Sequence, residues 1–107
     1  MIGRKVHIII DRPLGTYHPK HKNILYTVNY GYVRDVLGGD GEEQDVYLLG
    51  IDVPLSEFDG TVIAVIHRHN DNEDKWVAVP EGMNFTDEEI LAAVDFQERF
   101  FDITLER

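Results

Sequence analysis

Hydrophobic and β-branched residues gather in five short runs along the chain, and polar or glycine-containing stretches separate these runs. The first run is apolar apart from His7, and the third and fourth runs are almost continuously apolar. Runs of this length predict β-strands, and continuous apolar runs are typical of strands that are covered on both faces or closed into a barrel. The expected strands are residues 6–10, 26–33, 45–51, 61–67 and 75–79.

A helical pattern follows the last expected strand. Thr86 and Glu89 have the spacing of a capping box, which marks the start of a helix. The residues with helical spacing after this point are Ile90, Ala93, Val94, Gln97 and Phe101, with Leu91 and Phe100 beside them. We therefore predict a mainly β fold with one C-terminal helix that includes Phe101, in which the five strands form a small OB-type β-barrel.

Length and composition limit the class of protein. A chain of 107 residues with 43% hydrophobic and 28% charged residues is expected to form one domain, residues 1–107, around a single core. The absence of cysteine excludes disulfides and thiolate metal sites. No apolar run approaches the roughly 20 residues of a membrane span, and the first residues lack the apolar core of a signal peptide. We expect a cytoplasmic protein that does not interact with membranes.

Charge is distributed unevenly along the chain, which has a net charge of −10. Residues 1–34 contain six Lys or Arg and one acidic residue, whereas residues 35–107 contain four Lys or Arg and 19 acidic residues. So acidic a protein should repel nucleic acid over most of its surface. The basic segment could complete a phosphate and metal site by folding against an acidic loop, or the two halves could simply attract each other.

Three carboxylates lie close together in the first acidic stretch. Asp40, Glu42 and Asp45 occupy positions one, three and six of a glycine-containing turn that leads into an apolar run. Side chains at these positions can converge on one hard cation, and Mg²⁺ prefers oxygen ligands and commonly shares them with substrate phosphates. A solvated acidic turn is the alternative. An EF-hand is disfavoured because the alternating ligands and the distal Glu are missing.

The segment Tyr26-Thr27-Val28-Asn29-Tyr30-Gly31-Tyr32 precedes this acidic turn. Together they resemble the core signature of the soluble inorganic pyrophosphatases, in which a Tyr-x-x-Asn-Tyr-Gly-Tyr strand precedes an Asp-x-Asp-x-x-Asp metal loop by the same interval. Glu42 stands where the family has the middle Asp. Asp11-Arg12 and the segment 71–80 also look like parts of the family pattern, so the resemblance extends over nearly the whole chain.

The resemblance implies Mg²⁺-dependent hydrolysis of inorganic diphosphate to two phosphates by a metal-activated water. It implies Mg²⁺ ligands at Asp40, Glu42, Asp45, Asp71 and Glu73, with Asp74 as an alternative to Glu73. It implies diphosphate contacts from Arg12, Tyr26, Tyr30 and Lys75. In this interpretation Glu42 accepts the proton of the attacking water, and Tyr30 also takes part in catalysis.

The sequence departs from the family pattern in features that contact phosphate. The N-terminal segment that supplies a phosphate-binding Lys and two site glutamates is expected to be missing, and Phe100-Phe101 replaces a Tyr-Lys pair. These losses leave a second hypothesis open, in which the chain is a non-catalytic OB-type module that binds Mg²⁺ with phosphate or a nucleotide. A single-strand-binding OB domain is a third, which the net charge disfavours.

Histidines suggest one further kind of site. Zinc could bind the two close pairs His18/His21 and His67/His69, although such pairs are more often polar surface. The expected partner remains diphosphate or a related phosphate ligand. The sequence leaves open whether copies of the chain form a homo-oligomer.

Overall fold

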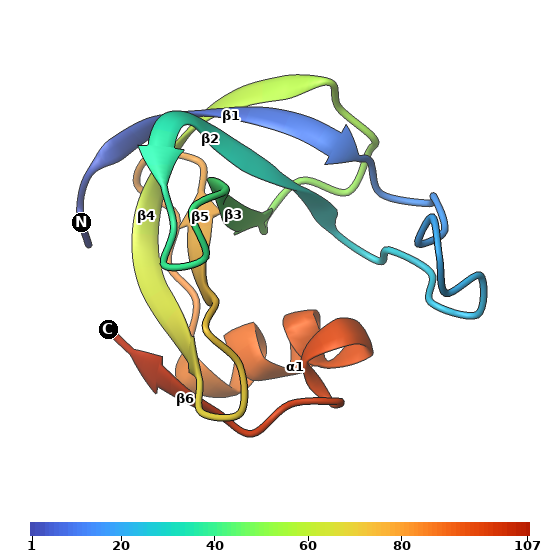
Figure 1. Ribbon diagram of the computed structural model, residues 1–107. Coiled ribbons are helices and arrows are strands. Elements are labelled where there is room, and N and C mark those ends of the chain that lie inside the picture. The colour runs from blue at the N-terminus through green and yellow to red at the C-terminus, as the bar shows by residue number, and fades with distance from the viewer.

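The computed structural model describes all residues from 1 to 107. Six strands and one helix follow one another in the order β1 (Lys5–Arg12), β2 (Asn29–Leu37), β3 (Glu43–Leu48), β4 (Glu57–Arg68), β5 (Asp74–Val79), α1 (Asp87–Glu98) and β6 (Ile103–Glu106) (Figure 1). β1 and β2 curve over one end of the molecule, and α1 and β6 lie at the other end. The loop that joins β1 to β2 extends away from the strands.

Five strands close into a barrel, which confirms the predicted OB-type architecture. Their order is β1-β2-β3-β5-β4, and β4 pairs back with β1. All of these pairs are antiparallel except the parallel pair β3–β5. β4 is longer than predicted because its polar first part, from Glu57 to Thr61, pairs with β1.

Alternate residues of the same strands belong to two separate hydrophobic clusters. In β3, Val46 and Leu48 belong to the cluster that includes Trp76, whereas Tyr47 belongs to the cluster that includes Ile90 of α1. Both faces of β3 are therefore covered, one by the barrel interior and the other by the helix. This arrangement explains the continuous apolar run that predicted a doubly covered strand.

Gly31 allows β1 and β2 to approach closely. A Cβ atom at this position would lie 1.8 Å from the backbone oxygen of Ile9. Any side chain here would force the two strands apart, so the glycine between Tyr30 and Tyr32 is required by the barrel itself. The close approach of the two strands also places Tyr30 beside the end of β1, where Arg12 is its partner in the ladder.

The helix begins as predicted but ends earlier. The Thr86 hydroxyl accepts a hydrogen bond from the Glu89 backbone, and the Glu89 carboxylate accepts one from the Thr86 backbone, which confirms the capping box. α1 ends at Glu98, so the prediction that Phe101 belongs to the helix was wrong, and Leu91 is 39% exposed. Phe101 lies in the loop that follows, where its ring contacts the Arg68 guanidinium.

The sixth strand was not predicted. β6 pairs antiparallel with the second part of β4, with Leu105 opposite Ile66. The second strand also begins later than predicted, at Asn29, and Tyr26 lies in the β1–β2 loop, where its backbone pairs with that of Gly15 and Thr16. The structure contains no helix with the length and hydrophobicity needed to span a membrane.

Candidate functional site

A cavity of about 560 Å³ lies where the β1–β2 loop, the β4–β5 hairpin and the end of α1 meet. Its charged lining residues are Asp11, Arg12, Asp45, Arg68, Glu73 and Lys75. Several of these positions follow from strand geometry, because residues two apart lie on the same face. The helix-facing side of β4 carries Ala64 and Ile66 and then reaches Arg68, so the cavity is the polar end of the face that α1 covers.

An irregularity in β1 turns two consecutive side chains toward the cavity. The pairing of β1 with β2 shifts register between Ile10 and Arg12. Neighbouring residues on a regular strand point to opposite faces, whereas a bulge re-aims one of them. Asp11 and Arg12 can therefore both line the cavity. Burial raises the pKa of the Asp11 carboxyl, while the neighbouring Arg12 acts to lower it.

Lys75 occupies the centre of the acidic part of the cavity. Its ammonium donates to Asp45 Oδ2 and to Glu73 Oε2, each at 2.5 Å. The Lys75 side chain is 3% exposed, and the Asp45 and Glu73 side chains are about one-third exposed. A buried ammonium is stable only when it is paired. The lysine and the two carboxylates therefore form one neutralised cluster rather than a free cation beside free anions.

Arg68 is fixed by a second ion pair. Its Nε donates to Glu98 Oε1 at 2.9 Å, and its Nη2 donates to Glu98 Oε2 at 2.5 Å. Its Nη1 makes longer contacts with Asp71, at 3.4 Å, and Glu73, at 3.5 Å. Burial acts to lower the pKa of Arg68, but the hydrogen bonds and charge of Glu98 outweigh it and raise the pKa. The guanidinium also lies 3.6 Å from the ring centre of Phe101.

A buried chain of hydrogen bonds joins the two arginines of the cavity. Arg12 Nη1 donates to the Tyr26 hydroxyl at 2.6 Å, and Tyr26 donates to Gln97 Oε1 at 2.6 Å. Gln97 Nε2 donates to the Tyr47 hydroxyl at 2.8 Å, and Tyr47 donates to Glu98 at 2.5 Å. Glu98 is the partner of the second arginine. No buried side-chain polar atom of the structure lacks a hydrogen-bond partner.

Tyr30 completes the wall between Arg12 and Lys75. Its ring centre lies 5.6 Å from the Arg12 guanidinium and 5.9 Å from the Lys75 ammonium. Burial, followed by the charge of Asp45, raises the pKa of the Tyr30 hydroxyl well above its usual value. The phenol therefore stays protonated near neutral pH and can donate a hydrogen bond to a ligand oxygen.

Asp40 extends the acidic cluster outward from Glu73. A hydrogen bond between the two carboxyl groups lowers the pKa of Asp40. Burial, followed by the same hydrogen bond, raises the pKa of Glu73. Glu73 also accepts a hydrogen bond from Lys75, so the ammonium already compensates part of the negative charge that these two carboxyl groups bring together. No three Asp, Glu or His side chains converge as a preformed metal centre.

The carboxylates of the cavity fit a metal ion that binds together with a ligand better than a metal ion held by side chains alone. Mg²⁺ uses one or two protein carboxylates and completes its shell with waters and substrate phosphates. Asp40 and Glu73, which lie next to Asp45, can supply these one or two carboxylates. The site therefore fits an ion that arrives with a phosphate ligand, rather than an ion held by a closed set of side chains. The four histidines considered as zinc ligands do not converge either.

The structure brings together most of the residues predicted from the sequence. Those that line the cavity are Arg12, Tyr30, Asp45, Glu73 and Lys75. Tyr26 lies behind Arg12 as its hydrogen-bond acceptor, and Asp40 and Asp71 contact lining residues. Glu42 is the exception. It is exposed, does not line the cavity, and donates only its backbone N–H, to Asp40 Oδ1 at 3.0 Å.

Four residues of the site were missed by sequence reasoning. They are Tyr47, Arg68, Gln97 and Glu98. Arg68 had one usable signal, since it is among only four basic residues in the acidic part of the chain and follows an apolar strand. Glu98 had none, because a glutamate near a helix end is usually solvated.

No protein-family model matches the chain, and no curated protein matches it in sequence. Solved structures do match. The inorganic pyrophosphatase from Ehrlichia chaffeensis superposes with a TM-score of 0.73 at 15% identity, covering 99% of this chain and 87% of that one. This chain has the inorganic pyrophosphatase fold.

Two further pyrophosphatase structures agree with this result. The enzyme from Helicobacter pylori matches with a TM-score of 0.70 at 14% identity, over 96% of this chain and 84% of that one. The enzyme from Neisseria gonorrhoeae matches with a TM-score of 0.68 at 20% identity, over 88% of this chain and 72% of that one. At such identities the likeness establishes the pyrophosphatase fold alone, and the activity has to be argued from the site.

Proposed function

We propose that the chain hydrolyses inorganic diphosphate in a Mg²⁺-dependent reaction at the cavity beside Lys75. The observation that carries this proposal is the buried Lys75 ammonium held between Asp45 and Glu73. A cavity that contains both basic and acidic side chains suits a ligand made of an anion and a cation, because each part of the ligand then contacts a side chain of opposite charge. Diphosphate complexed with a divalent cation is such a ligand.

The ion pairs of the cavity explain why metal and diphosphate should bind together. A bare diphosphate would meet the uncompensated charge of Asp45 and Glu73 once Lys75 turned toward it. When a divalent cation accompanies the anion, the carboxylates gain a new partner as Lys75 gains a phosphate oxygen. No charge is then left buried and unpaired, which would cost several kcal/mol. Asp40, beside Glu73, would hold the same ion.

The remaining groups would orient the phosphates. Arg12 uses one nitrogen to contact Tyr26, and its other N–H groups remain available in the plane of the guanidinium for phosphate oxygens. The protonated Tyr30 hydroxyl would donate to another oxygen. Mg²⁺ supplies charge neutralisation of the phosphates and activation of a water nucleophile.

A carboxylate has to accept the proton of the attacking water. The family resemblance points to Glu42, whereas burial raises the pKa of two carboxyl groups that line the cavity, Asp11 and Glu73. Of these two, Glu73 contacts Lys75, the proposed phosphate contact. A raised pKa suits a general base that works near neutral pH. We therefore assign the proton acceptor to Glu73 and regard Glu42 as the competing candidate.

One observation favours a second function. Lys75 and Arg68 are both committed to carboxylates, and the Arg68 guanidinium is also covered by Phe101. Arg12 is then the only cavity arginine whose N–H groups are not engaged by a carboxylate. With so few free donors, the cavity would bind a phosphate compound with Mg²⁺ without cleaving it.

Phosphate release from inorganic diphosphate, measured with and without Mg²⁺, tests the proposal. We expect release that depends on Mg²⁺ and that falls at least tenfold in Lys75→Ala, because charge-assisted contacts to phosphate contribute a few kcal/mol in the transition state. Lys5→Ala is the matched control, since Lys5 forms an exposed ion pair with Glu81. Binding of Mg²⁺ and diphosphate without any release would decide for the non-catalytic module.

A further inference from the structure

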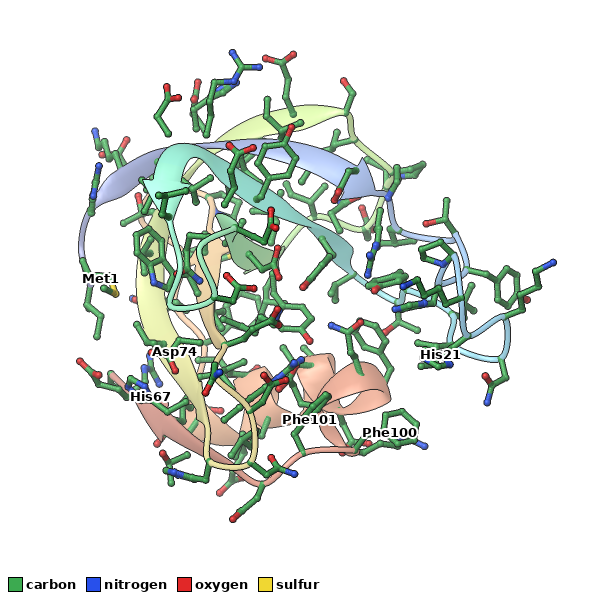
Figure 2. All side chains as sticks on the ribbon, in the orientation of Figure 1. Met1, His21, His67, Asp74, Phe100 and Phe101 are labelled. Carbon is green, nitrogen blue, oxygen red and sulfur yellow. The ribbon has the colours of Figure 1, made fainter.

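The outer part of the cavity has a different character from its charged floor. It is lined by Phe100, Phe101, Ile24, His18, His21 and Asn23. Figure 2 shows Phe100 and Phe101 side by side below the strands, with His21 across from Phe100 on the β1–β2 loop. A cavity of about 560 Å³ is in the range of sites that enclose whole organic molecules, and inorganic diphosphate is much smaller.

Phe100 presents an unused aromatic surface at this rim. It is 58% exposed, although it lines the cavity. The adjacent Phe101 differs because the Arg68 guanidinium lies on its ring. A large aromatic side chain left open at the mouth of a cavity that also contains Arg12 and Lys75 can take a flat ligand group on its face.

The imidazoles opposite are held in place by the loop. His18 Nδ1 accepts hydrogen bonds from the backbone N–H groups of Lys20 and His21, at 3.0 and 3.1 Å. The accepting Nδ1 leaves Nε2 as the protonated nitrogen of a neutral ring. The His18 and His21 rings lie 4.9 Å apart. Burial, followed by the charge of Arg12, lowers the pKa of His18 and favours the neutral form.

We propose that the cavity binds diphosphates that carry a flat heteroaromatic group, as nucleoside diphosphates do. The diphosphate would lie on Arg12 and Lys75, and the base would stack on Phe100. This inference rests on the proposed function in one respect, namely that the charged floor is a diphosphate site.

The polar groups of the rim favour a base over an alkyl chain. An alkyl group placed against the His21 imidazole and the Asn23 amide, which are exposed to solvent, would displace water without replacing its hydrogen bonds. A nucleobase has acceptors and donors along its edge, and the Asn23 amide offers one of each kind. The rim therefore combines a stacking surface with edge recognition.

Calorimetric titration in Mg²⁺ with two non-hydrolysable ligands tests this inference. Methylenediphosphonate represents the diphosphate alone, and α,β-methylene-ADP carries the same P–C–P unit with a nucleoside esterified to one oxygen, which removes one ionisable group. Stacking of one base on an aromatic side chain corresponds to roughly a fivefold to hundredfold gain in affinity. We expect α,β-methylene-ADP to bind at least about fivefold more tightly than methylenediphosphonate.

Substitution at the rim shows where any gain arises. Phe100→Ala should reduce the affinity ratio of the two ligands to near one, whereas Leu91→Ala, at an exposed position of α1 outside the cavity, should leave the ratio intact. Circular dichroism of both variants checks that the fold persists. A gain that survives in Phe100→Ala would overturn the rim assignment.

The failures of the two proposals can be told apart. If both ligands bind equally tightly, the nucleotide inference is overturned while the diphosphate site stands. If neither ligand binds, the diphosphate floor is wrong and both proposals fail. If α,β-methylene-ADP binds as expected but inorganic diphosphate is never hydrolysed, the inference holds and the proposed hydrolysis is overturned.

Discussion

Arg68 and Glu98 form a two-point ion pair although 30 positions separate them along the chain, and both side chains are buried. The pair connects the end of β4 to the end of α1. Its position suggests that it holds the helix against the barrel rather than binding a ligand.

Glu98→Ala should therefore affect stability strongly. Removal of one partner leaves the buried Arg68 charge without its carboxylate, and we expect a loss of about 3 kcal/mol in the free energy of unfolding. Urea denaturation measures the loss. Asp95→Ala is the control, because it breaks the exposed Asp95–Arg99 pair and should cost less than about 1 kcal/mol. Equal losses in the two variants would show that the pair is not a structural clamp.

Lys75→Met should convert the acidic cluster into a site for Mg²⁺ alone. The substitution keeps the apolar stem but leaves Asp45 and Glu73 facing each other without the ammonium between them. Millimolar Mg²⁺ should then raise the melting temperature by several degrees, and by more than in the wild type, because it binds the native state. Differential scanning fluorimetry measures the shift, with Lys5→Met as control. An unchanged melting temperature would mean that these carboxylates do not bind a cation together.

Glu73→Gln and Glu42→Gln separate the two candidate proton acceptors. We expect Glu73→Gln to reduce Mg²⁺-dependent phosphate release at least tenfold, because the amide cannot accept the proton and binds Mg²⁺ weakly. Glu42→Gln should have a smaller effect, since Glu42 is exposed outside the cavity. Steady-state rates across pH give the comparison. The reverse order of effects would return the role to Glu42.

His67 should make the stability of the C-terminal strand depend on pH. Its ring contacts Glu106 of β6 at 2.7 Å and Asp74 at 3.1 Å, and the hydrogen bond with Glu106 is the main cause that raises its pKa above 6.5. Because the folded pKa is higher, the stabilisation is complete below pH 6.5 and is lost as pH rises through the folded value.

Urea unfolding at about pH 6 and about pH 8 tests this sign. The wild type should lose more stability between the two conditions than His67→Gln, which cannot gain the proton. The effect should be modest because the His67 side chain is 36% exposed and its ion pairs are screened by solvent. An identical pH dependence in both proteins would exclude His67 as its source.

The barrel could be predicted because its strands have a strong local signal. Val46 and Leu48 point into the barrel while Tyr47 points to the helix, so the whole of β3 is apolar and stands out in the sequence. β6 lacks such a signal. Its four residues alternate between half-buried and exposed, and only their pairing with the edge of β4 makes them a strand.

The site residues that belong to a local sequence motif could be predicted. Those that depend on an ion pair between segments far apart in the sequence could not. Arg12, Tyr30 and Lys75 lie in segments whose pattern resembles a family, and all three line the cavity. Arg68 and Glu98 come from segments without a motif, and their burial results from the packing of α1. Local sequence cannot reveal that a charged side chain will be buried by a helix that lies far along the chain.

The hydrogen-bond chain from Arg12 through Tyr26, Gln97 and Tyr47 also has a dynamic consequence. It ties the loop after β1 to the last turn of α1. A ligand that immobilises Arg12 would therefore reduce local opening at the helix end. Amide hydrogen exchange at Gln97 and Glu98 would slow on ligand binding, even though the ligand touches neither backbone. The helix end would then report, in deuterium uptake, on the occupancy of a cavity formed largely by strands.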